Sequence, residues 1–389
     1  MKNFWLLLCV ITLSAPCFAN SDGDKIPNNQ IWYTTTDGNV MTFELNDFET
    51  FGANINSNTY ENGKGIITFD SNVTKIGSGA FSHCKSLTSI TIPNSVATIR
   101  TDAFSGSSNL KSITIPNSAP KIEPGAFTGC TSLKFNGKFA ADNGRCLIVD
   151  GKLVAFLPAE LTQYAIPNSV TEIGEGAFAI CVHLTNITIP NSVTKIGIGA
   201  FSKCRSLTNI TIPNSVTTIG EGAFTGCTSL KEFSGKFAAD NGRCLIIDGK
   251  LVSFTRTELS HYTIPSSVTK IGIGAFSHCI SLASVTIPDS VTTIEEGVFY
   301  KCVSLTSITI PNNVTEIGVR VFFDCPSLNS VYCKAITPPN LGVDALYYLN
   351  NYREEKIDCT IYVPRESVDA YKNAEGWNEY ADQIVGYDF

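Results

Sequence analysis

The chain has 389 residues, of which 43% are hydrophobic and only 16% are charged, and its formal net charge is −7. Such a chain can bury a large core. Its acidic balance, without any cluster of lysine or arginine, argues against nucleic acid as a partner. Beyond the N-terminus, no segment approaches the roughly twenty apolar residues of a membrane-spanning helix.

Residues 1–19 have the pattern of a secretory signal peptide. Lys2 forms a short positive region, an apolar run covers residues 4–13, and small residues lead to Ala19. The run has about half the length that a bilayer-spanning helix needs. We therefore expect export, and a protein that is extracellular or at the cell surface.

Residues 20–65 are polar, aromatic and rich in turn formers, unlike the regular sequence that follows. Terminal units of repeat proteins must cover a core that would otherwise be open to water. We expect residues 20–65 to form an N-terminal cap.

A repeat dominates the middle of the chain. Nine phenylalanines occur in three trios, with a spacing of 23 residues inside each trio. They are Phe81, Phe104 and Phe127, then Phe178, Phe201 and Phe224, then Phe276, Phe299 and Phe322. A fixed period of this size is typical of a stacked solenoid.

One unit reads L-x-x-I-x-I-P-x-x-V-x-x-I-G-x-G-A-F-x-x-C, as in the stretch from Leu207 to Cys227. Ile210 and Ile212 alternate with polar residues, which is typical of a strand with one buried face, and Pro213 ends that strand. We predict a β-rich repeat solenoid over residues 66–333, mostly strand with little helix. Nine to eleven rungs about 4.8 Å apart would form one parallel sheet roughly 50 Å long.

These units resemble the leucine-rich repeats of the BspA-like family over about residues 66–333. The resemblance implies a curved right-handed solenoid. It also implies a secreted or surface protein of a host-associated anaerobic bacterium or a parasitic protist. The role that it implies is adhesion to host extracellular proteins, such as fibronectin and fibrinogen, or to other bacteria.

Two copies of one insertion, at about residues 134–160 and 231–258, interrupt the period. Each places an Asp-Gly pair, Asp150-Gly151 or Asp248-Gly249, between two apolar runs, which is a strong signal for a β-hairpin. The hairpins are either protruding recognition elements or enlarged rungs that continue the core.

Residues 334–389 depart from the repeat and should form a C-terminal cap. The sequence IYVP predicts one last strand, and residues 365–384 predict an amphipathic helix. Its apolar stripe comprises Val368, Ala370, Tyr371, Trp377 and Tyr380. The strand and helix resemble the C-terminal cap of the same family.

Eight of the fourteen cysteines occupy one repeat position, three residues after the phenylalanine, and Ser107 takes the ninth place. At that position a small buried filler is the simplest interpretation. Outside the repeat position, Cys333 and Cys359 are the better candidates for a disulfide. Without a CxxC or HExxH motif or a nucleophile elbow, we expect no metal, no cofactor and no enzyme.

The candidate binding residues are the outward positions of the predicted strands. They are Ser89, Thr91, Ser112, Thr114, Asn186, Thr188, Asn209, Thr211, Ser284, Thr286, Ser307 and Thr309. This ladder either binds an extracellular protein or glycan, or only keeps the sheet soluble. We expect a monomeric adhesin that binds through the sheet face. A passive spacer of the cell envelope and a glycan-binding module are the alternatives.

Overall fold

The computed structural model describes residues 26–41, 47–118, 121–123, 125–158, 161–255, 258–350 and 353–389. The expected signal peptide, residues 1–19, lies outside these ranges. None of the described helices has both the length and the apolar character needed to cross a bilayer.

The described chain forms a solenoid whose coils each carry a longer and a shorter strand. The longer strands are β5 (Leu87–Thr91), β7 (Ser112–Thr114), β9 (Lys134–Asn136), β13 (Gln163–Ala165), β15 (Asn186–Thr188), β17 (Asn209–Ile212), β19 (Glu232–Gly235), β23 (His261–Thr263), β25 (Ser284–Thr286), β27 (Ser307–Ile310) and β29 (Ser330–Cys333). The shorter strands are β4 (Lys75–Ile76), β6 (Thr98–Ile99), β8 (Lys121–Ile122), β14 (Glu172–Ile173), β16 (Lys195–Ile196), β18 (Thr218–Ile219), β24 (Lys270–Ile271), β26 (Thr293–Ile294), β28 (Glu316–Ile317) and β30 (Asn340–Leu341). The predicted β-rich solenoid with little helix is thus confirmed.

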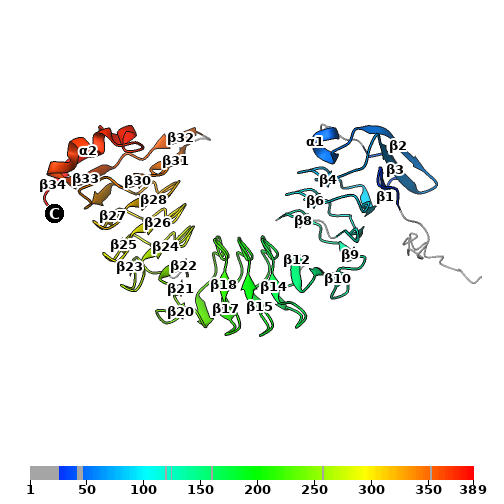
Figure 1. Ribbon diagram of the computed structural model, residues 1–389, viewed down its shortest axis with the longest axis horizontal. Coiled ribbons are helices and arrows are strands. Elements are labelled where there is room, and N and C mark those ends of the chain that lie inside the picture. The colour runs from blue at the N-terminus through cyan, green and yellow to red at the C-terminus, as the bar shows by residue number, and fades with distance from the viewer. Residues whose placement is uncertain are drawn as a thin grey trace, which may run out of the picture.

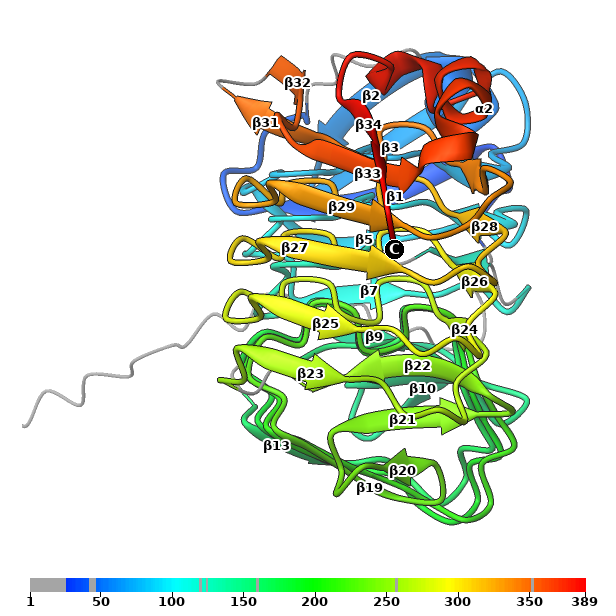
Figure 2. The ribbon, with the colours of Figure 1, turned by 90° about the vertical axis from the view of Figure 1, so that its left-hand side faces the viewer.

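The coils stack into an open arch (Figure 1). The shorter strands run along its inner side, and the longer strands run along its outer side (Figure 1). Viewed from the C-terminal arm, β23, β25, β27 and β29 lie one above the other as parallel strands (Figure 2).

The expected single sheet of roughly 50 Å is wrong. The longer strands fall into four sheets, because β9 does not pair with β13, β15 does not pair with β17, and β19 does not pair with β23. The first and last of these breaks coincide with the two insertions. Each insertion adds three strands to a sheet of shorter strands: β10 (Ala140–Ala141), β11 (Cys146–Val149) and β12 (Lys152–Phe156), then β20 (Ala238–Ala239), β21 (Cys244–Ile247) and β22 (Lys250–Phe254).

The hairpins that the Asp-Gly pairs predict are present as β11–β12 and β21–β22. They continue the core rather than leave it, since β12 pairs in parallel with β14, and β22 with β24. Cys146 and Phe156 pack on the rungs after the first hairpin, while Leu147 and Leu157 pack on the rungs before it. This arrangement favours the enlarged-rung interpretation.

The core is consequently divided into three clusters of buried side chains. They span positions 31–157, 146–252 and 244–384, and we call them the N-terminal, middle and C-terminal blocks. Within each block the phenylalanine rings stack face to face, as Phe178, Phe201 and Phe224 do. At the end of the stack a ring turns on edge, and Phe233 closes the middle block against Phe224 in this way.

The N-terminal residues form an antiparallel cap of β1 (Gln30–Thr35), α1 (Asp47–Phe51), β2 (Ile55–Glu61) and β3 (Lys64–Phe69). Strand β1 pairs with β3 on one side and with β5 on the other. The cap therefore continues the outer sheet. Because β1 covers the edge of β5, another chain cannot add a strand there.

The C-terminal cap has a shorter helix than the sequence predicts. It consists of β31 (Tyr347–Asn350), β32 (Arg353–Lys356), β33 (Thr360–Pro364), η1 (Arg365–Ser367), α2 (Val368–Asn373), η2 (Asn378–Tyr380) and β34 (Ile384–Tyr387). The helix ends at Asn373, because the backbone of the capping residue Ala374 is extended, with a φ of −73° and a ψ of 143°. Tyr371, Trp377 and Tyr380 are buried as expected, whereas Ala370 is exposed.

Candidate functional site

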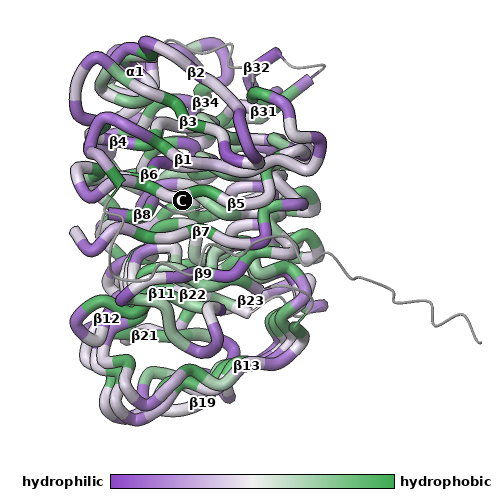
Figure 3. Tube along the Cα trace, turned by 90° about the vertical axis from the view of Figure 1, so that its right-hand side faces the viewer, coloured by the Kyte–Doolittle hydropathy of each residue, from purple (hydrophilic) through white to green (hydrophobic). Residues whose placement is uncertain are grey.

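All twelve predicted residues lie on the outer side of the arch, on β5, β7, β15, β17, β25 and β27. None of them is buried, whereas the residues between them, such as Ile210 and Ile308, are no more than 2% exposed. Along β5 and β7 the tube in Figure 3 accordingly changes between green hydrophobic residues and paler ones. The pattern places a row of hydroxyl and amide groups on the outer face, which we call the polar ladder.

The rungs of the polar ladder lie in register, so equal repeat positions are neighbours. Ser89 lies opposite Ser112, and Thr91 opposite Thr114. Some of these groups already bond to a neighbouring residue, since the hydroxyls of Thr211 and of Ser234 on β19 are 2.8 Å apart. Ser89 bonds to Thr34, and Ser284 bonds to His261. The exposed members of the ladder, where a partner can reach them, are Asn186, Thr188, Asn209, Thr211 and Thr286.

The ladder ends in aromatic residues at its C-terminal end. Tyr332 lies next to Thr309 in the register, Tyr362 next to Tyr332, and Val385 next to Tyr362. Tyr332 and Tyr362 stack with centroids 4.6 Å apart, and the ring of Tyr387 meets both at a steep angle. We call Tyr332, Tyr362, Tyr387 and Phe389 the aromatic cluster.

The aromatic cluster is partly open to solvent: Tyr332 and Tyr362 are half-buried, and Tyr387 and Phe389 are exposed. Val385, Tyr387 and Phe389 alternate along β34 and its continuation, and are 41%, 42% and 50% exposed. Large exposed apolar groups that gather on one face are typical of interaction sites. Our sequence interpretation missed this cluster, although Tyr332 stands one period after Thr309 and could have been found from that spacing.

A smaller aromatic site lies at the N-terminal end of the same face. Trp32 on β1 is opposite Thr91, and the ammonium group of Lys64 is 3.0 Å from the centroid of the indole ring. Such a contact is favourable through the charge of the cation and the quadrupole of the ring. The outer face is thus polar along its length and aromatic at both ends.

The repeat cysteines form hydrogen bonds in the core. The thiols of Cys130, Cys204 and Cys325 each donate to the carbonyl oxygen of the phenylalanine one rung earlier, at 3.0–3.1 Å. Ser107 makes the same bond to Phe81 at 2.6 Å. The position therefore requires a small donor, which explains why serine replaces cysteine there.

The expected disulfide between Cys333 and Cys359 is not formed, and both thiols are free. The strands β29 and β33 pair with Ser330 opposite Thr360, so Cys359 lies beside Asn329, four residues from Cys333. Four residues along a strand span about 13 Å. A disulfide requires Cα atoms within roughly 7 Å. The register of the two strands therefore keeps Cys333 and Cys359 too far apart for a disulfide.

Because the thiols are buried, we expect the stability of the folded protein to fall at alkaline pH. Burial raises the pKa of Cys325 to about 12, so above pH 9 this thiol ionises in the unfolded chain but keeps its proton in the folded one. Stability should then fall with rising pH, by about 1.4 kcal/mol per pH unit for this thiol. Urea unfolding of the native protein and of Cys325→Ser, at two pH values above 9, measures the difference. Equal pH slopes for the two proteins would contradict the prediction.

Among the described residues, no three His, Cys, Asp or Glu side chains gather as a metal site would require.

The chain matches the family described as BspA type leucine rich repeat region, in six copies over residues 53–137, 153–238 and 251–362. The unmatched stretches between them contain β10 and β11 in the first insertion and β21 in the second. No curated protein matches the chain.

Several solved structures are similar. A leucine rich cell surface protein from Faecalibacterium prausnitzii A2-165 has 27% identity and a TM-score of 0.50, over 85% of this chain and 86% of that protein. The pneumococcal vaccine antigen PcpA has 19% identity and a TM-score of 0.43, with coverage of 86% and 88%. A leucine-rich repeat protein from Bacteroides ovatus ATCC 8483 has 23% identity and a TM-score of 0.35, with coverage of 85% and 90%.

Proposed function

Because the chain belongs to the BspA-type leucine-rich repeat family, we propose that it is an exported, non-enzymatic adhesin that binds a macromolecular partner outside the cell. Leucine-rich-repeat solenoids are generally non-catalytic, and they bind partners through extended surfaces. The signal-like pattern of residues 1–19 and the similar cell surface protein support this location.

The observation that carries the proposal is the aromatic cluster at the end of the polar ladder. Binding energy in protein interfaces concentrates in a few residues, and tyrosine and tryptophan are enriched among them. The surrounding hydroxyl and amide groups can adapt their hydrogen bonds to a partner. The outer face of the C-terminal block therefore combines an aromatic cluster that can anchor a partner with neighbouring hydroxyl and amide groups that can bond to it.

The same face also suits a glycan, which is the second candidate. Tyr332 stands beside the small side chain of Thr309, and side chains on a strand stand roughly perpendicular to the sheet. One face of the Tyr332 ring stacks on Tyr362. The opposite face of the ring is therefore directed toward the space above Thr309. A sugar ring could lie against that face and bond to the nearby hydroxyls.

Binding of the chain without its signal peptide to immobilised extracellular-matrix proteins and to a glycan array tests both candidates. We expect Tyr362→Ala to weaken binding by about 2 kcal/mol, or roughly thirtyfold, as loss of an anchor residue does. Tyr300→Ala is the matched control, because Tyr300 stacks on Phe323 and belongs to none of the outer strands. Lysine at Thr188 and Thr211 should abolish binding without unfolding if the middle of the ladder is also used.

Absence of binding on both surfaces would reject the adhesin and the glycan-binding module, and leave the envelope spacer. Equal losses in Tyr362→Ala and Tyr300→Ala would reject the aromatic cluster as the anchor.

A further inference from the structure

The two insertions create two seams between blocks, and the duplicated sequence allows them to be compared residue by residue. The first seam separates the rung that contains β8 from hairpin β11–β12. The second separates the rung that contains β18 from hairpin β21–β22. By the repeat alignment, Lys152 of the first hairpin corresponds to Lys250 of the second, and Glu172 corresponds to Lys270.

At the second seam, a lysine side chain joins two blocks. Lys250 lies opposite Lys270 in the register, so its nearest neighbour on the sheet has the same charge. Its ammonium group contacts Glu295 at 2.7 Å and Glu221 at 3.3 Å. Glu221 belongs to a rung of the middle block, whereas Lys250 and Glu295 belong to the C-terminal block. A cation between two carboxylates therefore bridges this seam.

At the first seam, the equivalent lysine is held within its own block. Lys152 lies opposite Glu172 and pairs with it at 2.8 Å, and Glu172 also contacts Lys195 at 3.5 Å. Pro124 occupies the sequence position that corresponds to Glu221, so the chain has no carboxylate there. Within the described residues, no lysine or arginine forms an ion pair across this seam.

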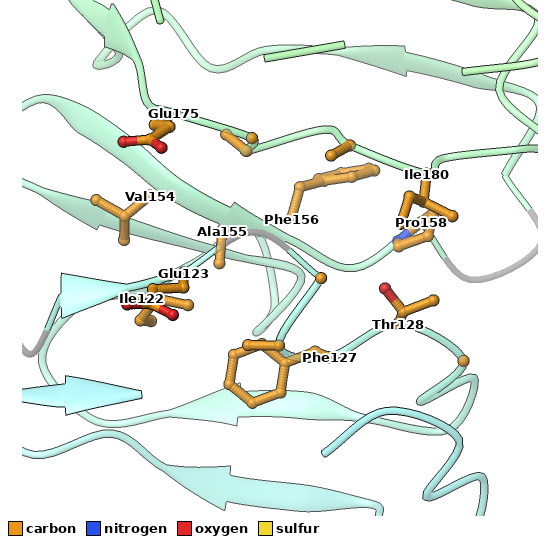
Figure 4. A pocket seen from close by; sticks show the side chains of 16 residues that line it. Ile122, Glu123, Phe127, Thr128, Val154, Ala155, Phe156, Pro158, Glu175 and Ile180 are labelled. Carbon is orange, nitrogen blue, oxygen red and sulfur yellow. The ribbon is translucent and has the colours of Figure 1, made fainter. Parts of the chain in front are cut away.

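The first seam instead contains a cleft with a carboxylate from each block. Glu123 comes from the N-terminal block and Glu175 from the middle block, and they lie on either side of Val154 (Figure 4). Glu123 accepts hydrogen bonds from Thr101 at 3.0 and 3.2 Å, and neither glutamate forms an ion pair in the described part of the chain. The apolar lining comprises Ile122, Phe127, Val154, Ala155 and Phe156.

The cleft continues into an open groove of about 500 Å³ on the inner side of the arch. The two share Ile122, Val154 and Glu175. Carboxylates outnumber ammonium groups along the combined lining, with Glu123, Asp150, Glu172 and Glu175 against Lys121 and Lys152. An apolar floor below an acidic rim complements a long aliphatic stem that ends in a positive charge.

We propose that the first seam binds a lysine or arginine side chain presented by a partner protein. The aliphatic stem packs on Ile122 and Val154, and the charged end lies between Glu123 and Glu175. Lys250 shows a related arrangement within the chain, at other repeat positions, where one ammonium group joins carboxylates of two blocks. This site is on the inner side of the arch, and its residues are separate from those of the outer face.

A short fluorescent peptide with one lysine among alanines, blocked at both ends, is the probe. The matched control peptide has norleucine in place of lysine, which keeps the stem and removes the charge. Titrated against the full chain without its signal peptide and followed by fluorescence anisotropy, the lysine peptide should bind at least tenfold more tightly than the norleucine peptide. Similar binding of the two peptides would overturn the proposal.

Variants then locate the site. Glu123→Gln and Glu175→Gln should each weaken binding of the lysine peptide at least fivefold, because each removes one charged hydrogen-bond acceptor. Glu296→Gln is the control, because Glu296 is an exposed glutamate at the same repeat position as Glu175, in the C-terminal block. Equal losses in all three variants would indicate attraction by net charge and overturn the proposal.

Millimolar calcium distinguishes a peptide site from a cation site. If calcium alone stabilises the native protein but not Glu123→Gln, and the lysine peptide does not bind, the seam holds a metal ion and the proposal is wrong. Tyr362→Ala should leave peptide binding unchanged, so failure of this proposal and failure of the outer-face proposal are separate results.

Discussion

Phe201→Ala should lower the free energy of unfolding by about 3–5 kcal/mol. The ring of Phe201 is fully buried and lies between Phe178 and Phe224, at centroid distances of 5.3 and 5.4 Å. Its removal leaves a cavity with a rung on each side, and neither rung can move inward without breaking its own strand pairing. Guanidinium unfolding followed by far-ultraviolet circular dichroism measures the loss.

Thr211→Ala is the control from the exposed face of the next rung. Thr211 is exposed, and among the described contacts its hydroxyl bonds only to the half-buried Ser234. The change should stay within about 0.5 kcal/mol, as is usual for surface positions. Equal effects of the two substitutions would show that the buried and the exposed positions of the coil have been assigned wrongly.

Gly235→Ala should cost more than about 3 kcal/mol, because backbone strain and a steric clash coincide there. Gly235 ends β19, where the chain leaves the outer face for the second insertion, and its φ is +91°. A Cβ atom at this position would lie 2.0 Å from the carbonyl oxygen of Ile212 and 2.9 Å from its carbonyl carbon. Backbone atoms of a paired strand cannot move aside as a flexible side chain can.

Gly63→Ala separates the effect of backbone strain from the effect of the steric clash. Gly63 has a φ of +78°, but no atom lies within 4 Å of an added Cβ. This substitution should cost only the left-handed backbone term of about 1–2 kcal/mol. Thermal unfolding of both variants is the measurement, and a Gly235→Ala variant as stable as Gly63→Ala would argue against the close approach to Ile212.

Much of the coil could be predicted because its causes are local. The 23-residue period shows which side chains share a position, and alternation along each strand shows which of them face inward. Ile210 and Phe201 are buried as this reasoning requires, and Asn209 and Thr211 are exposed. The Asp-Gly pairs also predicted both hairpins, because a two-residue turn with positive φ depends on those residue types alone.

The candidate site could be predicted only in part. The polar ladder follows from the repeat, but the aromatic cluster forms because β34 returns to pair with β33 and places Tyr387 against Tyr332 and Tyr362. No local pattern around Tyr387 indicates that pairing. The same limit explains the disulfide error, since the distance between Cys333 and Cys359 depends on the register of β29 and β33.

The sequence by itself thus determined the repeating coil, its buried phenylalanines and its polar outer face, because side-chain periodicity and turn chemistry act over a few residues. Only the tertiary structure decided how each hairpin is shared between two cores and which charges meet across the seams. Those outcomes depend on strand register between segments far apart in the chain. A shift of one residue there would exchange Glu172 for another neighbour of Lys152 without changing any local signal.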